Sequence, residues 1–489
     1  MIRPGETIDP GRLGRLIATL PADLVAAQRW FGAKKRGIVR LELHDAAPLP
    51  GRAGEPEAAL LVLEVRYADG GGERYLMPLV RAPDEEANDP SQLRVPDENG
   101  KTLMREPRDG DGVGRRVIEA IAAGAPLRGL HGVFESEAGS ALTTLLPASA
   151  LTDTRLPERR LRIDQTNTSL IVGERVVVKI FRKLEPGTNP DIELGRFLTE
   201  RDFKETPAFA GSIRYVDASG VACSAGLVQA YVADGADGWA ASVAELRGWL
   251  AAPAGTILME AATAEGARLG TITARLHAAL AGGRDERDFA PRWASPATTR
   301  EWRRAAERQL DDALALLGGQ ARDEVAALVP RIRAHFAAFE NATAPPILIR
   351  VHGDYHLGQV LRSGKRRWVV DFEGAPTRSL VERRQRQSPL SDVASMLRSF
   401  DHVARQALRE TGGGPGLDLE EWLLGSRRRF LAAYRAELAR HATPIAVDPG
   451  LLRAFEFEKE CYELTYEARY MPDWLWMPVA SLRALVSTG

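Results

Sequence analysis

The spacing of apolar residues changes along the chain from the pattern of strands to the three- and four-residue repeat of helices. In the first half, short apolar runs bounded by Gly, Pro, Asn and Asp predict strands. These runs cover residues 39–44, 58–67, 73–80, 161–164, 170–172, 176–181 and 226–232. The helical repeats predicted further on cover residues 264–280, 298–317, 321–340, 390–407 and 454–470. We therefore expect an α+β protein with a β-rich first half and a mainly helical second half.

The first part of the chain has the pattern of a small α+β unit. Residues 11–31 read as one helix, and the strands at 58–67 and 73–80 are joined into a hairpin by the turn Asp69–Gly72. The polar stretch 82–114, rich in Pro and Gly, predicts a linker or a mobile loop.

The sequence Gly-Asp-Gly-Val-Gly at 110–114 superficially suggests a dinucleotide-binding turn. No strand precedes it and its final spacing is wrong, so we expect a flexible loop. The chain also contains no G-x4-G-K-[ST] motif. Any ATP site must therefore be built in another way.

A second β-rich segment carries the candidate phosphate-binding residues. The strand at 161–164 runs into a polar loop and then a two-stranded meander, which can fold over a triphosphate with backbone N–H groups and short hydroxyls as donors. The candidate loop residues are Gln165, Thr166, Asn167, Thr168 and Ser169. Lys179 lies inside the last apolar run, where its charge needs a partner or a ligand.

A predicted helix follows Lys179 and offers it a partner. Asn189 and Pro190 form a helix start, and Glu193 lies in the first turns. A kinase places such a lysine on the nucleotide phosphates and orients it with a helical glutamate. Alone, Lys179 would be an edge-strand lysine whose charged end reaches water. The acidic motifs downstream favour the kinase interpretation.

The strand at 226–232 leads out of the β-rich half. It contains Gln229 and Tyr231 and precedes the Gly-rich stretch 234–238. A kinase hinge at this place would offer backbone groups to adenine. We include Gln229 and Tyr231 in the predicted nucleotide site on position alone.

The stretch between residues 352 and 373 is the most informative one. Asp354 is followed five residues later by Gln359, which reproduces the Asp-x4-Asn spacing of a kinase catalytic loop with Gln for Asn. Asp371 and Glu373 end a second apolar run and are two residues apart. On an extended segment both carboxylates would face the same side.

Phosphoryl transfer needs a carboxylate at the attacking hydroxyl and oxygen ligands for Mg²⁺. Either half of this stretch alone would be an ordinary polar loop, but both halves in this order favour a phosphotransferase. We predict Asp354 as the catalytic base. The predicted Mg²⁺ ligands are Gln359, Asp371 and Glu373.

The helix predicted at 454–470 has a second face besides its apolar stripe. Lys459, Tyr462 and Tyr466 lie on this face at positions i, i+3 and i+7. Aromatic rings beside charged hydrogen-bonding groups are typical ingredients of a sugar site. The predicted acceptor site consists of Asp354, His356, Lys459, Tyr462 and Tyr466.

Several of these motifs carry a family resemblance. HGDYHLGQVL at 352–361 and VVDFEGAP at 369–376 resemble the aminoglycoside-phosphotransferase and choline-kinase group of protein-kinase-like folds. The segments at 165–193, 371–400 and 458–478 resemble bacterial maltokinases, including the maltokinase part of trehalose synthase fusions. Arg-Trp-Phe-Gly, shortly before the first strand, resembles the N-terminal cap of the same enzymes.

The resemblance implies a bilobal protein-kinase-like fold and a specific activity. The expected parts are an N-terminal cap at 1–90, a β-rich nucleotide-binding lobe at 91–236 and a helical lobe at 237–489. The cofactors implied are ATP and Mg²⁺. The implied reaction converts maltose to maltose 1-phosphate, in a route from trehalose to α-glucan with trehalose synthase as a pathway partner.

The residues alone leave other functions open. A glucosamine kinase or another sugar kinase of the same fold is the nearest alternative. Glucosamine kinases share the catalytic loop, and their acceptor would profit from an acidic group at the amine. Glu463 and Glu467, on the flank of the acceptor helix, offer such groups. A non-catalytic kinase-fold binding protein is an alternative of a different class, although intact Lys179, Asp354 and Asp371 argue against it.

Composition bears on the partners and the cellular compartment of the protein. The 489 residues have a net charge of −1, which provides no general attraction to nucleic acid or to anionic membranes. Two cysteines far apart in the chain, Cys223 and Cys461, fit a reducing compartment. No stretch has the pattern of a signal peptide or a membrane span. We expect a cytoplasmic protein whose partners are a sugar and ATP.

Overall fold

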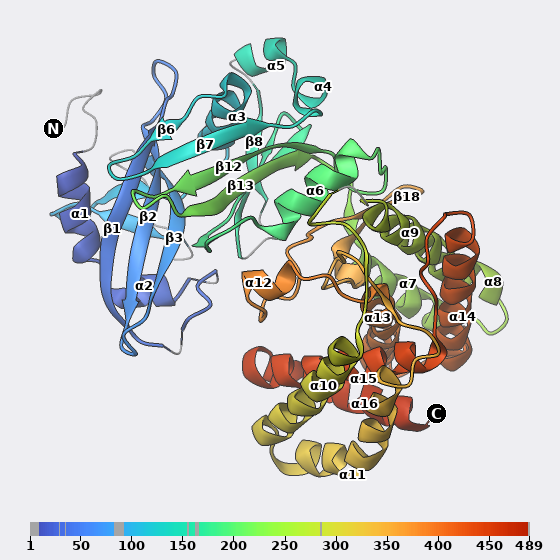
Figure 1. Cartoon of the computed structure of the whole chain (residues 1–489). Helices are drawn as coiled ribbons and strands as arrows, with labels where there is room; N and C mark the ends of the chain where they lie inside the picture. The colour runs from blue at the N-terminus through green and yellow to red at the C-terminus, as the bar shows by residue number, and fades with distance from the viewer. Residues whose placement is uncertain are drawn as a thin grey trace. The chain divides into compact units, whose positions relative to one another are not determined.

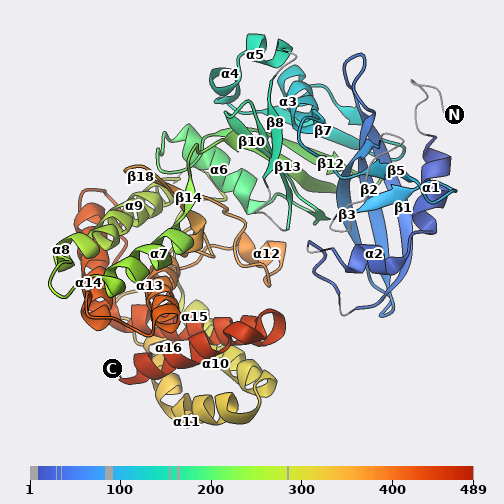
Figure 2. The same ribbon diagram turned by 180° about the vertical axis from the view of Figure 1, so that it is seen from behind.

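The computed structural model describes residues 9–28, 30–34, 36–82, 92–153, 156–161, 166–283 and 286–487. The chain divides into two compact units, whose elements are labelled in Figure 1 and seen from behind in Figure 2. Unit 1 comprises Met1–Glu200 and Pro207–Ala233, and unit 2 comprises Arg201–Thr206 and Asp234–Gly489. Unit 1 contains two β-sheets and unit 2 is mainly helical, so the predicted α+β class is confirmed. The finer division at residues 90 and 236 stays a prediction.

The first sheet of unit 1 is antiparallel, with strand order β1-β2-β3-β5-β4 and with β11 paired to β3. Its strands are β1 Ile38–Leu49, β2 Ala58–Tyr67, β3 Gly72–Arg81, β4 Arg94–Pro96, β5 Thr102–Arg105 and β11 Lys183–Leu184. The predicted hairpin is confirmed, because β2 and β3 pair along their whole length. Two helices, α1 Pro10–Ala18 and α2 Ala22–Ala26, pack against β1 (Figure 1).

The prediction of one helix over residues 11–31 is wrong. The helix breaks after Ala18 and a second one starts at Ala22, with Pro21 as its N-terminal cap. Proline disfavours the helical conformation of the residue before it, here Leu20. The apolar repeat continues through the break, which is why the pattern did not reveal it.

The prediction of a linker over residues 82–114 is wrong for the part that the structure describes, and residues 83–91 lie outside that part. Strands β4 and β5 extend the first sheet, and helix α3 Val113–Ala123 begins inside the stretch. The expected flexible loop at 110–114 is held by Asp111, whose carboxylate accepts hydrogen bonds from the Arg105 guanidinium (2.5 Å) and the Arg108 N–H (2.6 Å).

The second sheet of unit 1 has strand order β6-β7-β12-β13-β10-β9-β8. Its strands are β6 Leu127–Arg128, β7 Val133–Ala138, β8 Glu158–Leu161, β9 Thr168–Val172, β10 Val176–Ile180, β12 Phe209–Val216 and β13 Ala222–Ala230. The remaining helices of unit 1 are α4 Leu142–Leu145, α5 Ala148–Thr152 and α6 Pro190–Glu200. The predicted meander is confirmed, because β9 and β10 pair around a turn at Gly173.

One buried carboxylate ties the two sheets of unit 1 together. Asp45 of β1 is fully buried and accepts hydrogen bonds from the N–H groups of Leu130 (2.5 Å) and His131 (3.2 Å), in the turn between β6 and β7. It also accepts a hydrogen bond from the hydroxyl of Tyr215 on β12 (2.8 Å). A buried charge persists only when such donors surround it.

Unit 2 consists of helices with a few short strands. The helices are α7 Gly238–Ala251, α8 Met259–Ala262, α9 Ala264–Ala281, α10 Pro296–Leu316, α11 Gly319–Phe336, α12 Leu380–Arg383, α13 Pro389–Thr411, α14 Leu419–Leu438, α15 Pro449–Tyr470 and α16 Trp476–Ser487. The short strands are β14 Ala236–Asp237, β15 Arg292–Trp293, β16 Ile347–Leu348, β17 Val360–Ser363 and β18 Arg366–Val369. The five predicted helices are confirmed. Over the described residues, every helix is too short or too polar to span a bilayer.

Helices α9 and α14 pack closely because α9 presents glycines at the contact. A Cβ atom on Gly266 would lie 2.5 Å from the Ser426 carbonyl oxygen, and one on Gly270 would lie 2.2 Å from that of Phe430. Any larger residue would push the helices apart. This close packing sets the distance between His277, further along α9, and Tyr434 on α14.

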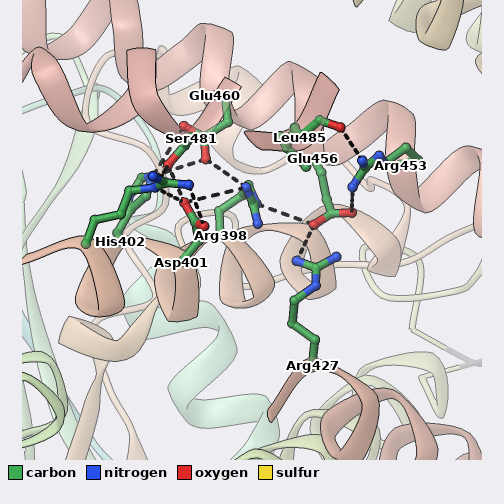
Figure 3. Close-up of polar contacts among 10 residues, drawn as sticks. Arg398, Asp401, His402, Arg427, Arg453, Glu456, Glu460, Ser481 and Leu485 are labelled. Atoms are coloured by element: carbon green, nitrogen blue, oxygen red, sulfur yellow. Dashed lines mark hydrogen bonds and ion pairs between the residues drawn. The ribbon is translucent and has the colours of Figure 1, made fainter. Parts of the chain in front are cut away.

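Buried ion pairs join α15 to α13 (Figure 3). Arg398 of α13 lies 3.3 Å from Glu456 and 3.5 Å from Glu460, and His402 lies 3.0 Å from Glu460. Asp401 of α13 contacts Ser481 of α16 in the same network. Because each buried charge must meet its own partner, the network fixes the register of α15.

Asp45→Ala should destabilise unit 1. The substitution leaves buried donors unpaired, at a cost of about 1–3 kcal/mol for each. Urea unfolding should show a lower midpoint, and Tyr215→Phe, which removes one donor from the cluster, should lower it less. Equal midpoints for Asp45→Ala and the parent protein would contradict the proposed role.

Candidate active site

A buried carboxylate holds the loop that carries Asp354. Asp392, in the first turn of α13, accepts hydrogen bonds from the N–H groups of His352 (2.8 Å) and Gly353 (3.0 Å). His277 lies 3.2 Å from the same carboxylate through Nε2, and its Nδ1 lies 2.7 Å from the Tyr434 hydroxyl. His277 is fully buried, and these contacts join α9 to α13 and α14.

Asp392 remains ionised in this setting. Burial raises the pKa of its carboxyl, but the hydrogen bonds and charge of His277 and the Gly353 N–H outweigh burial and hold the pKa below its ordinary value. The sequence prediction missed Asp392. In the sequence, Asp392 is an acidic residue in the first turn of the predicted helix, three residues after Pro389.

The structure brings Asp354 and Lys459 together within unit 2. Lys459 Nζ lies 3.3 Å from Asp354 Oδ1 and 2.8 Å from Glu463 Oε1. Burial raises the pKa of Asp354, but the positive charge of Lys459 outweighs it, so the pKa lies below its ordinary value. Asp354 is therefore an ionised, half-buried carboxylate at neutral pH, as a proton acceptor must be.

His356 also faces Asp354. Its Nε2 lies 3.8 Å from Asp354 Oδ2, and its Nδ1 accepts the N–H of Gly358 (3.1 Å). Burial lowers the pKa of His356 despite the nearby Asp354 charge. The ring is therefore neutral at pH 7, with its proton on Nε2, the atom that faces Asp354.

The three predicted metal ligands lie side by side. Gln359 Nε2 donates a hydrogen bond to Asp371 Oδ2 (3.2 Å), and carboxylate oxygens of Asp371 and Glu373 lie within 4.8 Å of one another. The assumption of an extended segment is wrong, because Asp371 has a left-handed φ of 65°. This turn brings the two carboxylates together instead. An amide carbonyl and two carboxylates form an oxygen-rich donor set that fits Mg²⁺.

A cavity of about 550 Å³ opens beside the catalytic loop in unit 2. Its wall includes Gly353, Lys459, Tyr462, Arg378, Gln309 and Trp302. The volume lies within the range of about 300–1,000 Å³ that is usual for small-molecule sites. A mixed wall of aromatic rings and hydrogen-bonding groups suits a polar ligand such as a sugar.

The predicted aromatic face of α15 is present. The Tyr462 hydroxyl accepts a hydrogen bond from Thr377 (3.1 Å), and its ring lies under Lys459 Nζ at 4.7 Å. The rings of Tyr462 and Tyr466 stack with centroids 6.2 Å apart, and Tyr470 continues the row at 5.1 Å. Tyr470 was not among the predicted site residues.

In unit 1, Lys179 forms an ion pair with Asp191. Lys179 Nζ lies 3.1 Å from Asp191 Oδ2, and both side chains are buried. Asp191 stands in the first turn of α6, two residues before Glu193, the partner predicted from the sequence. The helix was therefore predicted correctly, but Asp191 was missed, and the role of half-buried Glu193 stays a prediction.

The predicted phosphate loop is shorter than expected. Thr168 and Ser169 lie in β9, buried and paired with Ile180 and Lys179, so they belong to a strand. Asn167 accepts the N–H of Arg182 through its side chain (3.3 Å). Gln165 lies outside the described residues. Thr166 remains as a loop residue.

The predicted hinge residues lie at the end of β13. Gln229 pairs with Val177 of β10, and Tyr231 follows the strand. The Tyr231 hydroxyl accepts a hydrogen bond from Arg159 (2.9 Å). Their contact with adenine stays a prediction.

Comparison with known proteins identifies the class. A family model described as "Maltokinase N-terminal cap domain" matches residues 25–106, and one described as "Phosphotransferase enzyme family" matches residues 158–414. The second match covers more than half of the chain. The chain belongs to the phosphotransferase enzyme family, and the predicted protein-kinase-like fold is confirmed.

Two relatives match this chain along most of their own length. A glucosamine kinase of Streptacidiphilus jiangxiensis is 32% identical over 429 residues, covering 86% of this chain and 87% of that protein. One of Mycolicibacterium smegmatis is 32% identical over 432 residues, covering 88% of this chain and 99% of that protein. The specific resemblance to maltokinases is thus supported for the cap, whereas these relatives are named glucosamine kinases.

Solved structures of glucosamine kinases are also similar to this chain over nearly its whole length. A glucosamine kinase in complex with glucosamine, ADP and inorganic phosphate has a TM-score of 0.67 at 30% identity, covering 96% of this chain and 98% of that one. A second crystal form of glucosamine kinase has a TM-score of 0.71 at 29% identity, covering 97% and 99%.

Asp354→Asn should lower turnover by about 10²–10⁴-fold, the usual contribution of a positioned acid–base group. The amide cannot accept the proton, yet it keeps the shape of the loop. Steady-state kinetics should show the loss in kcat, and calorimetry should show unchanged nucleotide affinity. Unchanged turnover would remove Asp354 from the mechanism.

Lys459→Met should move the acid limb of the pH profile of kcat to higher pH. The substitution removes the cation that lowers the pKa of Asp354 and leaves the burial that raises it. Because Asp354 must be ionised to accept a proton, activity should then be lost at a higher pH on acidification. Tyr466→Phe, which keeps the ion pair, is the control. An acid limb that stays in place in Lys459→Met would contradict this assignment.

Proposed function

We propose that the protein is an ATP-dependent sugar kinase that phosphorylates glucosamine. The observation that carries the proposal is its likeness, over nearly the whole chain, to a glucosamine kinase structure that holds glucosamine and ADP. The ionised Asp354 beside a polar cavity supports the same reaction class. The proposed partners are therefore glucosamine and ATP.

The proposed reaction moves the γ-phosphoryl group of ATP to a sugar hydroxyl. Asp354 accepts the proton of the hydroxyl as its oxygen bonds to phosphorus and the bond to ADP breaks. Lys459 keeps Asp354 ionised and places it, and His356 offers an N–H on the same side. The products are ADP and the sugar phosphate.

The nucleotide and metal roles are proposed from the residues present. Lys179, held by Asp191, would bind the nucleotide phosphates, with the backbone around Thr166 nearby. Gln359, Asp371 and Glu373 would hold Mg²⁺. When bound, Mg²⁺ would offset the negative charge of the nucleotide phosphates.

Maltose is the second candidate acceptor. The match of residues 25–106 to the maltokinase cap domain favours it, as do the stacked rings of Tyr462 and Tyr466. In that case the product would be maltose 1-phosphate, and an enzyme that forms maltose from trehalose would be the pathway partner. The full-length relatives favour glucosamine over maltose.

A panel of acceptors tests the proposal. With purified protein, ATP and Mg²⁺, we expect kcat/KM for glucosamine to exceed that for maltose and for glucose. Asp354→Asn is the inactive control. A higher kcat/KM for maltose would overturn the choice of acceptor and leave the kinase assignment standing, whereas ATP turnover with none of these sugars would overturn the acceptor class.

A further inference from the structure

Cationic side chains contribute to the wall of the cavity beside the catalytic loop, and one of them stands apart. The cations are Arg308, Arg378, Arg386 and Lys459. Three of them have a carboxylate partner: Arg308 with Glu301 (2.6 Å), Arg378 with Glu458 (3.5 Å) and Lys459 with Glu463 (2.8 Å). Arg386, between α12 and α13, forms no ion pair with any residue that the structure describes.

The hydrogen bonds of Arg386 are also incomplete. Its Nη2 donates to the carbonyl of Arg287. Its Nε is buried and has no hydrogen-bond partner, and its Nη1 forms no hydrogen bond, within the described part of the chain. The side chain is half-buried and contributes to the cavity wall. Because a guanidinium has donors on all three nitrogens, Arg386 keeps N–H groups for a ligand.

The pairing of two chain segments places another cation opposite Arg386. The N–H of Ile349 donates to the carbonyl of Gln387 (3.0 Å), and the N–H of Gln387 donates back to Ile349 (2.8 Å). In antiparallel pairing, the next residues on the two segments, Arg350 and Arg386, then lie across from each other. Like charges in directly opposite positions are destabilising.

A third arginine lies on the same face. Arg292 of β15 pairs with Leu348, and side chains two residues apart on a strand, such as Leu348 and Arg350, share a face. Burial, followed by the charges of Arg292 and Arg350, lowers the pKa of Arg386, although Asp288 has the opposite effect. This part of the wall therefore has an excess of positive charge that an anion would balance.

The acidic side chains of the wall are bound elsewhere. Glu301 and Glu458 pair with the other two arginines of the wall. Glu382 accepts hydrogen bonds from the N–H (2.8 Å) and the hydroxyl (2.7 Å) of Ser379 at the start of α12. Asp392 holds the catalytic loop. The excess positive charge is thus left for a ligand in the cavity.

A phosphate monoester is the anion that best fits this place. Arginine binds phosphate through paired N–H groups. The proposed reaction forms such a group on a sugar in the same cavity, beside ionised Asp354, which repels it. Arg350, opposite Arg386, is four residues before Asp354, a span of at most about 14 Å. A sugar phosphate that turns within the cavity can therefore exchange repulsion by Asp354 for attraction by Arg386.

We infer that Arg386 binds the phosphate group of a sugar phosphate in this cavity, so that the phosphorylated product competes with the unphosphorylated sugar. The inference rests on the proposed function and adds a binding site for its product. Binding is non-covalent, so no bond forms or breaks in this step.

Calorimetry with glucosamine 6-phosphate, without nucleotide or Mg²⁺, tests the site directly. We expect Arg386→Gln to raise Kd about 10-fold, the size of one lost hydrogen bond to a charged group, and Arg386→Lys to recover part of the loss. Arg308→Gln is the matched control, because Arg308 belongs to the same wall but has a carboxylate partner, and its Kd should stay within twofold. Melting temperatures without ligand verify that each variant folds. An unchanged Kd in folded Arg386→Gln would overturn the inference.

Steady-state kinetics and a second anion identify the ligand. Glucosamine 6-phosphate should inhibit the parent protein competitively with glucosamine, and its Ki should rise about 10-fold in Arg386→Gln while KM for glucosamine changes less. Inorganic phosphate should bind more weakly than the sugar phosphate. Equal affinity, with the same dependence on Arg386, would indicate a site for free phosphate and overturn the choice of ligand. If Arg386 is needed to bind glucosamine 6-phosphate but the parent protein does not phosphorylate glucosamine, the proposed function alone fails.

Discussion

The catalytic loop depends on one buried carboxylate, that of Asp392. Its two oxygens accept the backbone N–H groups of His352 and Gly353, the residues directly before Asp354. His277 holds the same carboxylate, and the close glycine contact of α9 with α14 places His277 beside Tyr434. The position of the proposed base is therefore set by helix packing, several contacts away from any substrate.

Helix α15 has a comparable role on the acceptor side. Its inner face is held by ion pairs of Glu456 and Glu460 with α13, and its other side presents Lys459 to Asp354. Buried ion pairs of this kind contribute little net stability, but they penalise any shift in register. A slip of one residue would take Lys459 away from Asp354 and leave charges unpaired on both sides. The network thus protects the geometry of the site more than it stabilises the fold.

Local patterns predicted most of the elements and the acidic motifs. The hairpin of β2 and β3, the meander around Lys179 and the five long helices all follow from apolar spacing, which depends on burial of one face. The errors arose where a single contact overrules the pattern. Pro21 breaks a continuous apolar repeat, and Asp111 orders a loop that its glycines suggested was flexible.

The site was predicted less completely, because the missed residues act through contacts distant in sequence. Asp354, Gln359, Asp371 and Glu373 lie within twenty residues, so their spacing carries the signal. Spacing does not reveal Asp392, because the N–H groups that it binds, those of His352 and Gly353, lie about forty residues earlier in the chain. Asp191 was hidden by Glu193, because both are acidic residues of one helical turn and only the fold shows which one Lys179 meets.

The sequence does not predict the sugar acceptor, because it does not show which charged side chains of α15 pair with one another. The residues of α15 offer a cation, aromatic rings and several carboxylates, and this composition fits a neutral disaccharide as well as an amino sugar. The fold alone decides which of these carboxylates meet a cation. Glu463 pairs with Lys459 and Glu460 pairs with His402, whereas burial and these two neighbouring carboxylates raise the pKa of Glu467. This pairing of charges across helices is a property of the packed structure rather than of any motif.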